Sequence, residues 1–181
     1  MASYDDEIWR LVPAEPRPAP AHLARFVSSL PAAERALDLG CGDGRLGAEL
    51  RAANLTAADV SQVALERARA RLPEANVVAL QADAPLPFDD GEFDLVLCAE
   101  TIEHVRDVQL LLSEIRRVLS PGGTLALTTP AHWRLMATPD PLSPHIRFLT
   151  RRSLRRLLEE HGFEPVELRR RAGTLLARAA R

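Results

Sequence analysis

The stretch ALDLGCGDG, residues 36–44, joins a short apolar run to three glycines at alternate positions. The apolar residues 36–39 predict a buried strand. Glycines directly after a strand let the chain turn sharply and bring backbone N–H groups against a ligand, and a helix, expected here over about 46–53, then presents its positive end. In open α/β sheets ligands bind at the carboxyl ends of the strands. The stretch therefore predicts a strand, a glycine turn and a binding site at the strand's end.

Strands and helices alternate on the C-terminal side of this stretch. Ser61, Asp107 and Thr150 are residue types that cap helix N-termini, each directly before a run with helical apolar spacing. The predicted strands are 36–39, 56–60, 77–81, 93–98, 124–128, 166–168 and 174–177, and the predicted helices are 22–30, 46–53, 61–72, 107–120 and 150–161, with Gly162 as C-cap.

The last two predicted strands are separated only by residues 169–173, and so short a link joins strands in an antiparallel hairpin. The earlier strands are separated by helices, and several are apolar on both faces, which indicates parallel pairing with both faces covered. We therefore expect a Rossmann-like, doubly wound α/β fold. Its mainly parallel sheet would have about seven strands with a C-terminal antiparallel hairpin, and helices on both faces.

The composition bounds the class of protein. The chain has 181 residues, of which 46% are apolar and 27% charged, and its net charge is −2. These values predict one folded domain rather than a disordered chain. The first ten residues are acidic where a signal peptide would be basic and then apolar, two cysteines make no disulfide framework, and no apolar run approaches the ~20 residues of a membrane span. We expect a cytoplasmic protein with reduced thiols and no membrane span.

We expect the domain to occupy residues 22–181 and to be preceded by an N-terminal arm, residues 1–21. Four prolines between Pro13 and Pro20 fix φ and lack an N–H, so this arm is expected to be extended.

Charge is unevenly distributed along the chain. Residues 1–140 contain 13 Arg and 21 acidic residues, whereas residues 141–181 contain 10 Arg and 4 Glu. Such a basic cluster could bind an acidic partner such as RNA, a phosphorylated metabolite or a carrier protein, but more often it is the solvated face of a helix. No stacking aromatics alternate with these arginines, which argues against nucleic acid as the partner.

Asp59 ends the second predicted strand, 19 residues after Gly40. At this spacing a carboxylate accepts hydrogen bonds from ribose hydroxyls, which indicates an adenosine-containing ligand. The alternative role is a helix-capping acid ahead of Ser61. Gly42-x-Gly44-x-x-Gly47 also matches the dinucleotide pattern, but it begins inside the turn, and this register argues against a nicotinamide-dependent oxidoreductase.

Five motifs together resemble the class I S-adenosylmethionine-dependent methyltransferases. The resemblance covers about residues 36–163 and is greatest to the methyltransferase type 11 group, similar to enzymes of ubiquinone and menaquinone biosynthesis. The motifs, in order, are ALDLGCGDG (36–44), AADVS (57–61), QADAPLPFDDGEFDLVLCAE (81–100), EIRRVLSPGGTLALTTP (114–130) and PHIRFLTRRSLRRLLEEHGF (144–163).

The resemblance implies a role for each matching position. Asp38, Gly40, Cys41 and Gly42 would hold the methionine moiety, and Asp59 the ribose. Val60 would pack on the adenine, whose edge Asp83 and Ala84 would meet, and Ala99 and Glu100 would line the sulfonium region together with Cys98. Tyr4 and Trp9 could fold over the cofactor or pack on the rim of the core. Cys41 and Cys98 follow neighbouring strands and are expected to be buried and inert.

The resemblance also implies methyl transfer to a small-molecule acceptor by in-line displacement, in which positioning is the protein's main contribution. An acceptor that must lose a proton needs a base; the candidates are Glu103, His104, His132 and His145. Oligomeric state and acceptor identity do not follow from the sequence.

Two alternatives accompany this reading. One is a non-catalytic S-adenosylmethionine-binding partner or regulatory protein. The other is a metal-assisted RNA or small-molecule O-methyltransferase, because Glu100-x-x-Glu103-His104 with the distant His145 resembles a divalent-metal site of small-RNA methyltransferases. Since the same motif occurs in relatives without a known metal, we expect no metal here.

Overall fold

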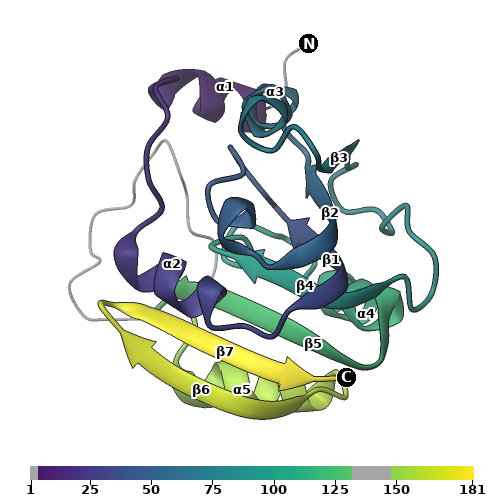
Figure 1. The fold of residues 1–181 in the computed structure, drawn as a ribbon. Helices are drawn as coiled ribbons and strands as arrows, with labels where there is room; N and C mark the ends of the chain where they lie inside the picture. The colour runs from purple at the N-terminus through teal and green to yellow at the C-terminus, as the bar shows by residue number, and fades with distance from the viewer. Residues whose placement is uncertain (1–3, 132–147) are drawn as a thin grey trace.

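The computed structural model describes residues 4–131 and 148–181, which form a seven-stranded sheet covered by helices (Figure 1). The strand order is β3-β2-β1-β4-β5-β7-β6. Strands β1 to β5 pair in parallel, and β7 runs antiparallel to both β5 and β6. This confirms the predicted fold class and the closing hairpin. The strands are β1 (Ala33–Leu39), β2 (Ala52–Asp59), β3 (Asn76–Ala79), β4 (Phe93–Ala99), β5 (Leu119–Pro130), β6 (Glu164–Arg171) and β7 (Thr174–Ala180).

Helices cover both faces of the sheet because successive strand residues point to opposite sides. On one face Leu95, Leu97 and Leu176 share a core cluster with apolar residues of α2, and α3 packs over Ala57 beside them. On the other face the strand residues cluster with the leucines of α4 and α5. The helices are α1 (Tyr4–Leu11), α2 (Ala21–Ser28), α3 (Gln62–Arg71), α4 (Val108–Val118) and α5 (Arg151–Glu160), with a short 3₁₀ helix at Gly47–Glu49.

The predicted N-caps are confirmed. The side chains of Ser61, Asp107 and Thr150 each accept a hydrogen bond from the backbone N–H three residues later. These bonds satisfy donors that the first helical turn leaves free, and they fix where α3, α4 and α5 begin.

The helix predicted over 46–53 is wrong. Only Gly47–Glu49 is helical, as a single 3₁₀ turn, and β2 already begins at Ala52. Ala52 pairs with Ala33 at the start of β1, so sheet pairing takes residues whose local propensity favours a helix.

The N-terminal arm is not extended throughout. Residues 4–11 form α1, which has Asp5, Asp6 and Glu7 in its first turn and Arg10 in its last, the order that stabilises a helix. The prolines that argue against a helix begin only at Pro13. From Pro13 to Pro20 the chain contains no helix or strand, as expected.

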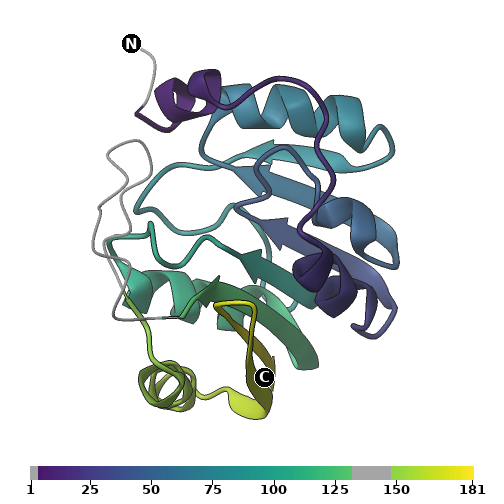
Figure 2. The ribbon, with the colours of Figure 1, turned by 90° about the vertical axis from the view of Figure 1, so that its left-hand side faces the viewer.

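The hairpin tip lies beside the carboxyl end of β5. Pro130 pairs with Thr174, and the N–H of Ala131 donates to the carbonyl of Gly173 over 2.7 Å. Ala131 also bridges to Leu149, directly before α5. In Figure 2 the hairpin forms the lower end of the sheet, and α5 lies beside it. The turn at Ala172 and Gly173 and the first residues of α5 are therefore at the same edge of the sheet as the glycine turn after β1.

None of the helices in residues 4–131 and 148–181 is both long and apolar enough to cross a membrane.

Candidate functional site

A hollow of about 220 Å³ opens at the carboxyl ends of β1 and β4. Six of the ten predicted cofactor-binding residues line it, and Asp59, Val60, Asp83 and Ala84 do not. The lining residues are Trp9, Pro20, Leu23, Asp38, Gly40, Cys41, Gly42, Asp43, Arg45, Leu46, Ala99 and Glu100.

The glycine turn leaves no room for side chains. Gly40 and Gly42 have φ of +72° and +55°, which favour glycine. A Cβ at Gly40 would lie 2.4 Å from Oγ1 of Thr101, and a Cβ at Gly42 would lie 2.6 Å from Cζ2 of Trp9. The turn is therefore in direct contact with the loop after β4 and with α1.

Asp38, at the end of β1, has one carboxylate oxygen without a partner. The residue is 2% exposed, and among the described residues no group hydrogen-bonds its Oδ2. Burial, together with the negative charge of Asp59, raises the pKa of Asp38 to about 7. An unsatisfied buried carboxylate is costly. A ligand that brings a cationic donor, such as an ammonium group, to the base of the hollow would satisfy this oxygen.

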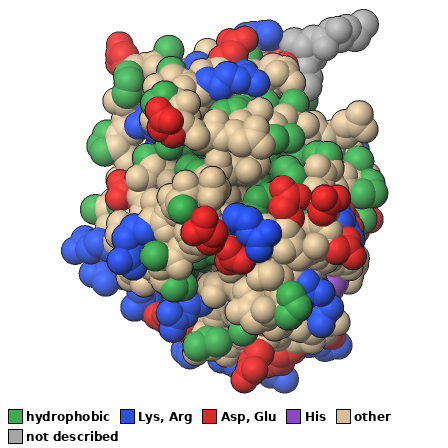
Figure 3. All heavy atoms as spheres, turned by 45° about the vertical axis from the view of Figure 1, so that its right-hand side comes forward, with side chains coloured by type: hydrophobic (Ala, Val, Ile, Leu, Met, Phe, Trp, Pro, Cys, Tyr) green, Lys and Arg blue, Asp and Glu red, His purple; other side chains and the backbone are tan. Residues whose placement is uncertain are grey.

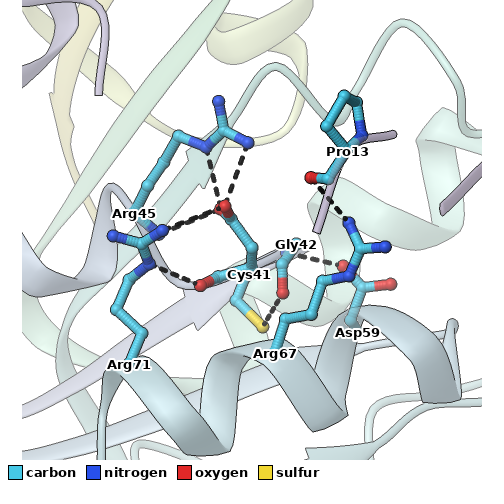
Figure 4. A network of polar contacts seen from close by, with 8 residues as sticks. Pro13, Cys41, Gly42, Arg45, Asp59, Arg67 and Arg71 are labelled. Atoms are coloured by element: carbon cyan, nitrogen blue, oxygen red, sulfur yellow. Dashed lines mark hydrogen bonds and ion pairs between the residues drawn. The ribbon is translucent and has the colours of Figure 1, made fainter. Parts of the chain in front are cut away.

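Asp59, at the end of β2, is equally buried but well bonded. Its Oδ2 accepts from the N–H of Gly42 over 2.8 Å (Figure 4). Its Oδ1 accepts from the N–H of Ser61 over 2.9 Å. Burial nevertheless raises the pKa of Asp59 above its usual value. Asp59 thus connects the glycine turn to the start of α3.

Two arginines hold the far side of the glycine turn, an arrangement that sequence reasoning missed. Arg45 donates to both carboxylate oxygens of Asp43 over 2.8 and 3.0 Å, and Arg71 of α3 reaches the same carboxylate over 3.3 Å (Figure 4). Burial would raise the pKa of Asp43, but the hydrogen bonds and charges of both arginines lower it below its usual value. The only sequence signal was Arg45 two residues after Asp43.

Helix α1 packs against α3 and reaches the hollow. The buried Asp6 accepts from Oγ of Ser61 over 2.7 Å and from the N–H of Val63 over 3.3 Å. The guanidinium of Arg67 lies 5.6 Å from the ring centre of Trp9 and donates to the carbonyl of Val12. Trp9 thereby lines the hollow, whereas Tyr4 is 53% exposed and is not among its lining residues.

Of the predicted adenine contacts, Asp83 lies in an exposed loop after β3 with φ of +54°, and Ala84 and Val60 are half-buried. The role of these three residues stays a prediction.

Glu100 and Glu103 lie in the loop after β4, and each is bonded to the end of β5. Thr128 donates to Glu100 over 2.8 Å, and Thr129 donates to Glu103 over 3.1 Å. Glu103 is 1% exposed, and burial together with the charge of Glu100 raises its pKa to about 8. Nε2 of His104 lies 4.0 Å from Glu103. The candidate base Glu103 is therefore buried beside the hollow rather than open to it.

The candidate base His132 and the distant His145 lie outside the described residues. Within residues 4–131 and 148–181, no three His, Cys, Asp or Glu side chains form a group that could hold a metal ion. Because His145 would complete the metal set, the absence of a metal stays a prediction.

Both cysteines are free and buried, as predicted. Burial raises the pKa of the thiols of Cys41 and Cys98, so neither is activated as a nucleophile.

A second hollow, of about 460 Å³, lies at the opposite edge of the sheet, where α4 and α5 end. Its arginines bind backbone carbonyls: Arg181 donates to Leu119, and Arg116 donates to Gly162 over 3.4 Å. These contacts explain the arginines as structural, so the candidate site is the hollow at the glycine turn.

Comparison with solved structures defines the class of the fold. An S-adenosylmethionine-dependent methyltransferase from Mesorhizobium loti superposes with a TM-score of 0.71 at 20% identity, covering 90% of this chain and 99% of that one. The [4+2]-cyclase SpnF superposes with a TM-score of 0.75 at 20% identity, covering 88% of this chain and 80% of that one. The fold is that of the Rossmann-like methyltransferases.

Sequence comparison defines the family. A family model described as a methyltransferase domain matches residues 37–127, so the chain belongs to this methyltransferase family, whose cofactor is S-adenosylmethionine. The ubiquinone biosynthesis O-methyltransferase of Dechloromonas aromatica is 31% identical over 161 residues, 76% of this chain and 67% of that protein. An uncharacterized methyltransferase of Mycobacterium tuberculosis is 40% identical over 98 residues, 51% of this chain. The chain spans about half the length of several such relatives, including 49% of the mycobacterial protein.

Proposed function

We propose that the protein transfers a methyl group from S-adenosylmethionine to a small-molecule acceptor by in-line displacement. The observation that carries the proposal is that Asp38, a buried carboxylate with one unpartnered oxygen, lines the hollow directly beside the close-packed glycine turn. The ammonium group of a bound methionine moiety has the charge and the donors that this oxygen lacks. The residues present therefore fit this cofactor.

Within this proposal, the end of each strand binds one part of the cofactor. Asp38, Gly40, Cys41 and Gly42 hold the methionine moiety, since all four line the hollow. The carboxylate of Asp59, fixed by Gly42 and Ser61, accepts the ribose hydroxyls. Val60, Asp83 and Ala84 contact the adenine, and Ala99 and Glu100 line the region of the sulfonium.

The cofactor supplies a methyl group already activated by its positive sulfur, so the chain needs mainly to orient the acceptor and exclude water. Trp9 covers the glycine turn and narrows the hollow on the α1 side. On the β4 side, Glu100 faces the hollow and the buried Glu103 lies behind it. With a pKa raised to about 8 and its side chain buried, Glu103 is mostly protonated near neutral pH, so an acceptor that must lose a proton would need another base.

The test is calorimetric titration of the protein with S-adenosylmethionine, S-adenosylhomocysteine and NAD. We expect micromolar affinity for the first two and no binding of NAD. Asp59→Ala should weaken the binding of S-adenosylhomocysteine by about a hundredfold, because charge-assisted hydrogen bonds contribute about 1.5–3 kcal/mol each. Asp89→Ala, the loss of an exposed acid after β3, is the matched control and should leave the affinity unchanged.

NAD binding, or equal losses in both variants, would refute the proposed site. Binding of S-adenosylmethionine without turnover on any acceptor in a broad screen would favour the non-catalytic binding protein over the enzyme.

A further inference from the structure

Helix α5 carries its charges in the order that destabilises a helix. Arg151 and Arg152 occupy its first turn, where the helix dipole favours acids, and Glu159 and Glu160 occupy its last, where it favours bases. Helix α1 has the opposite, stabilising order. Helix stability therefore does not account for the two arginines at the start of α5.

Ion pairs distinguish two sets of three among the arginines of α5 and β6, with Arg170 in neither. Arg155, Arg156 and Arg169 each form an ion pair with a glutamate on their own element, over 3.6, 2.7 and 3.0 Å. Arg151, Arg152 and Arg171 are exposed, and none of the described residues forms an ion pair with any of them. On the face in Figure 3 acidic and basic side chains lie next to one another at the centre, and side chains of like charge group together toward both margins.

The three arginines without ion pairs stand at the edge that holds the candidate site. Arg171 pairs with Thr174 across the hairpin, and Thr174 pairs with Pro130 at the end of β5. Two residues before Pro130, Thr128 holds Glu100 in the hollow. Arg151 and Arg152 lie at the same edge because Leu149, two residues before Arg151, forms a bridge with Ala131 at the end of β5.

The acceptor must approach from this side of the hollow if the cofactor lies over β1 and β2. We propose that Arg151, Arg152 and Arg171, here called the arginine edge, bind an anionic group carried by the acceptor, a phosphate or a carboxylate. The inference rests on the proposed function and names the substrate class. Guanidinium groups bind both anions through paired N–H donors, and an anion would offset the repulsion among the three cations and with the helix dipole.

The experiment is an NMR titration of the full chain with pyrophosphate and, separately, citrate, at about 150 mM salt to screen long-range effects. The test variant is Arg151→Gln/Arg152→Gln/Arg171→Gln. The matched control is Arg155→Gln/Arg156→Gln/Arg169→Gln, which removes three paired arginines from the same two elements. Affinity for S-adenosylhomocysteine is measured in all three proteins by calorimetry.

We expect the unmodified protein to bind one of the two anions with a Kd of about 1 mM or tighter, and the test variant to bind it at least about tenfold more weakly. The control should stay within about threefold of the unmodified protein, because its arginines are already paired. A preference for pyrophosphate indicates a phosphorylated acceptor, and a preference for citrate a carboxylic acid. S-adenosylhomocysteine should bind all three proteins equally.

Anion binding that is absent, or equally weakened in test and control variants, would overturn the arginine edge. Tighter binding of a single-stranded RNA oligomer than of either anion, lost in the test variant, would also overturn it and assign the edge to nucleic acid. Failure of S-adenosylhomocysteine to bind the unmodified protein would refute the proposed function itself, whatever the anions do.

Discussion

The two ends of the strand order differ in their charged side chains: those near β1 and β2 are buried, and those near β6 and α5 are exposed. Over β1 and β2 the key charges are carboxylates, Asp38 and Asp59, which are buried and at most 8% exposed. Over β6 and α5 they are arginines such as Arg151 and Arg171, which are exposed and without ion pairs in the described residues. Removing a charge from water is costly, so buried carboxylates are held in one geometry before any ligand arrives. Exposed arginines without ion pairs can change conformation, and a bound ligand would fix their positions.

The largest effect near β1 and β2 is expected from Gly42→Ala in the glycine turn. The backbone there has φ of +55°, and the new Cβ would lie 2.6 Å from Trp9. We expect the free energy of unfolding to fall by about 2–5 kcal/mol, from left-handed strain and displacement of the ring. Gly122→Ala is the control, because φ is +78° and nothing lies within 4 Å of its Cβ. Urea denaturation that shows equal losses in both variants would mean that Trp9 does not constrain the turn.

Stability should depend on pH through the buried acids. Burial raises the folded-state pKa of Asp38 to about 7 and that of Glu103 to about 8, so the folded protein binds more protons than the unfolded chain between about pH 4 and 8. As far as these groups decide it, the free energy of unfolding should therefore be greatest at about pH 4 and below. It should fall steadily as the pH rises to about 8, by up to about 4 kcal/mol for each group, since one pKa unit corresponds to about 1.4 kcal/mol.

Glu103→Gln checks this dependence. The variant should flatten the upper part of the decline in urea denaturation, whereas Glu92→Gln, in a partly exposed loop, should leave the profile unchanged. A variant profile identical to that of the unmodified protein would show that folding does not raise the pKa of Glu103.

Binding of the ligand should cause Asp38 to release a proton. An ammonium group placed against its carboxylate lowers its pKa from about 7, so binding of S-adenosylhomocysteine at pH 6 should release up to one proton, and at pH 8.5 almost none from this group. Calorimetry in buffers with different heats of ionisation measures the release. Asp38→Asn should abolish it and weaken binding by about tenfold. Undiminished proton release in that variant would assign the proton to another group.

The smallest effect should come from the contact between α1 and α3. Asp6→Ala removes the hydrogen bonds to Ser61 and Val63, and we expect a loss of about 1 kcal/mol of stability and faster proteolysis within residues 4–12. Glu7→Ala, on the exposed side of the same turn, is the control. If both variants resist protease as the unmodified protein does, α1 is held by Trp9 and Arg67 instead.

The strands and caps could be predicted from the sequence because each signal was local. Ser61, Asp107 and Thr150 act on backbone groups three residues away, and the apolar strand residues mark both faces of the sheet. The helix predicted over 46–53 failed because pairing of Ala52 with Ala33 is a contact between distant residues. The arm was predicted to be extended although residues 4–11 form α1. The acids at 5–7 favour the start of a helix, but the prediction relied on the prolines further along the arm.

The candidate site was predictable to the extent that it is built from strand ends. Asp38 lies at the end of β1, Gly40 and Gly42 follow this strand, and all three line the hollow. The contacts from other elements could not be read: Arg71 on Asp43 and Asp6 on Ser61 depend on how α3 and α1 pack. Likewise, the cluster of arginines was visible as composition, but only the ion pairs divide it into two sets.

Strand β5 lies between the glycine-turn strands and the C-terminal hairpin. Within the sheet, β7 and β6 connect to the other strands only through the pairing of β7 with β5. The hairpin can therefore accumulate changes in length, charge and turn type without disturbing the pairing of β1, β2 and β4. Under the proposal that the arginine edge binds the acceptor, substitutions in the hairpin would change the preference for acceptors and leave the glycine turn intact.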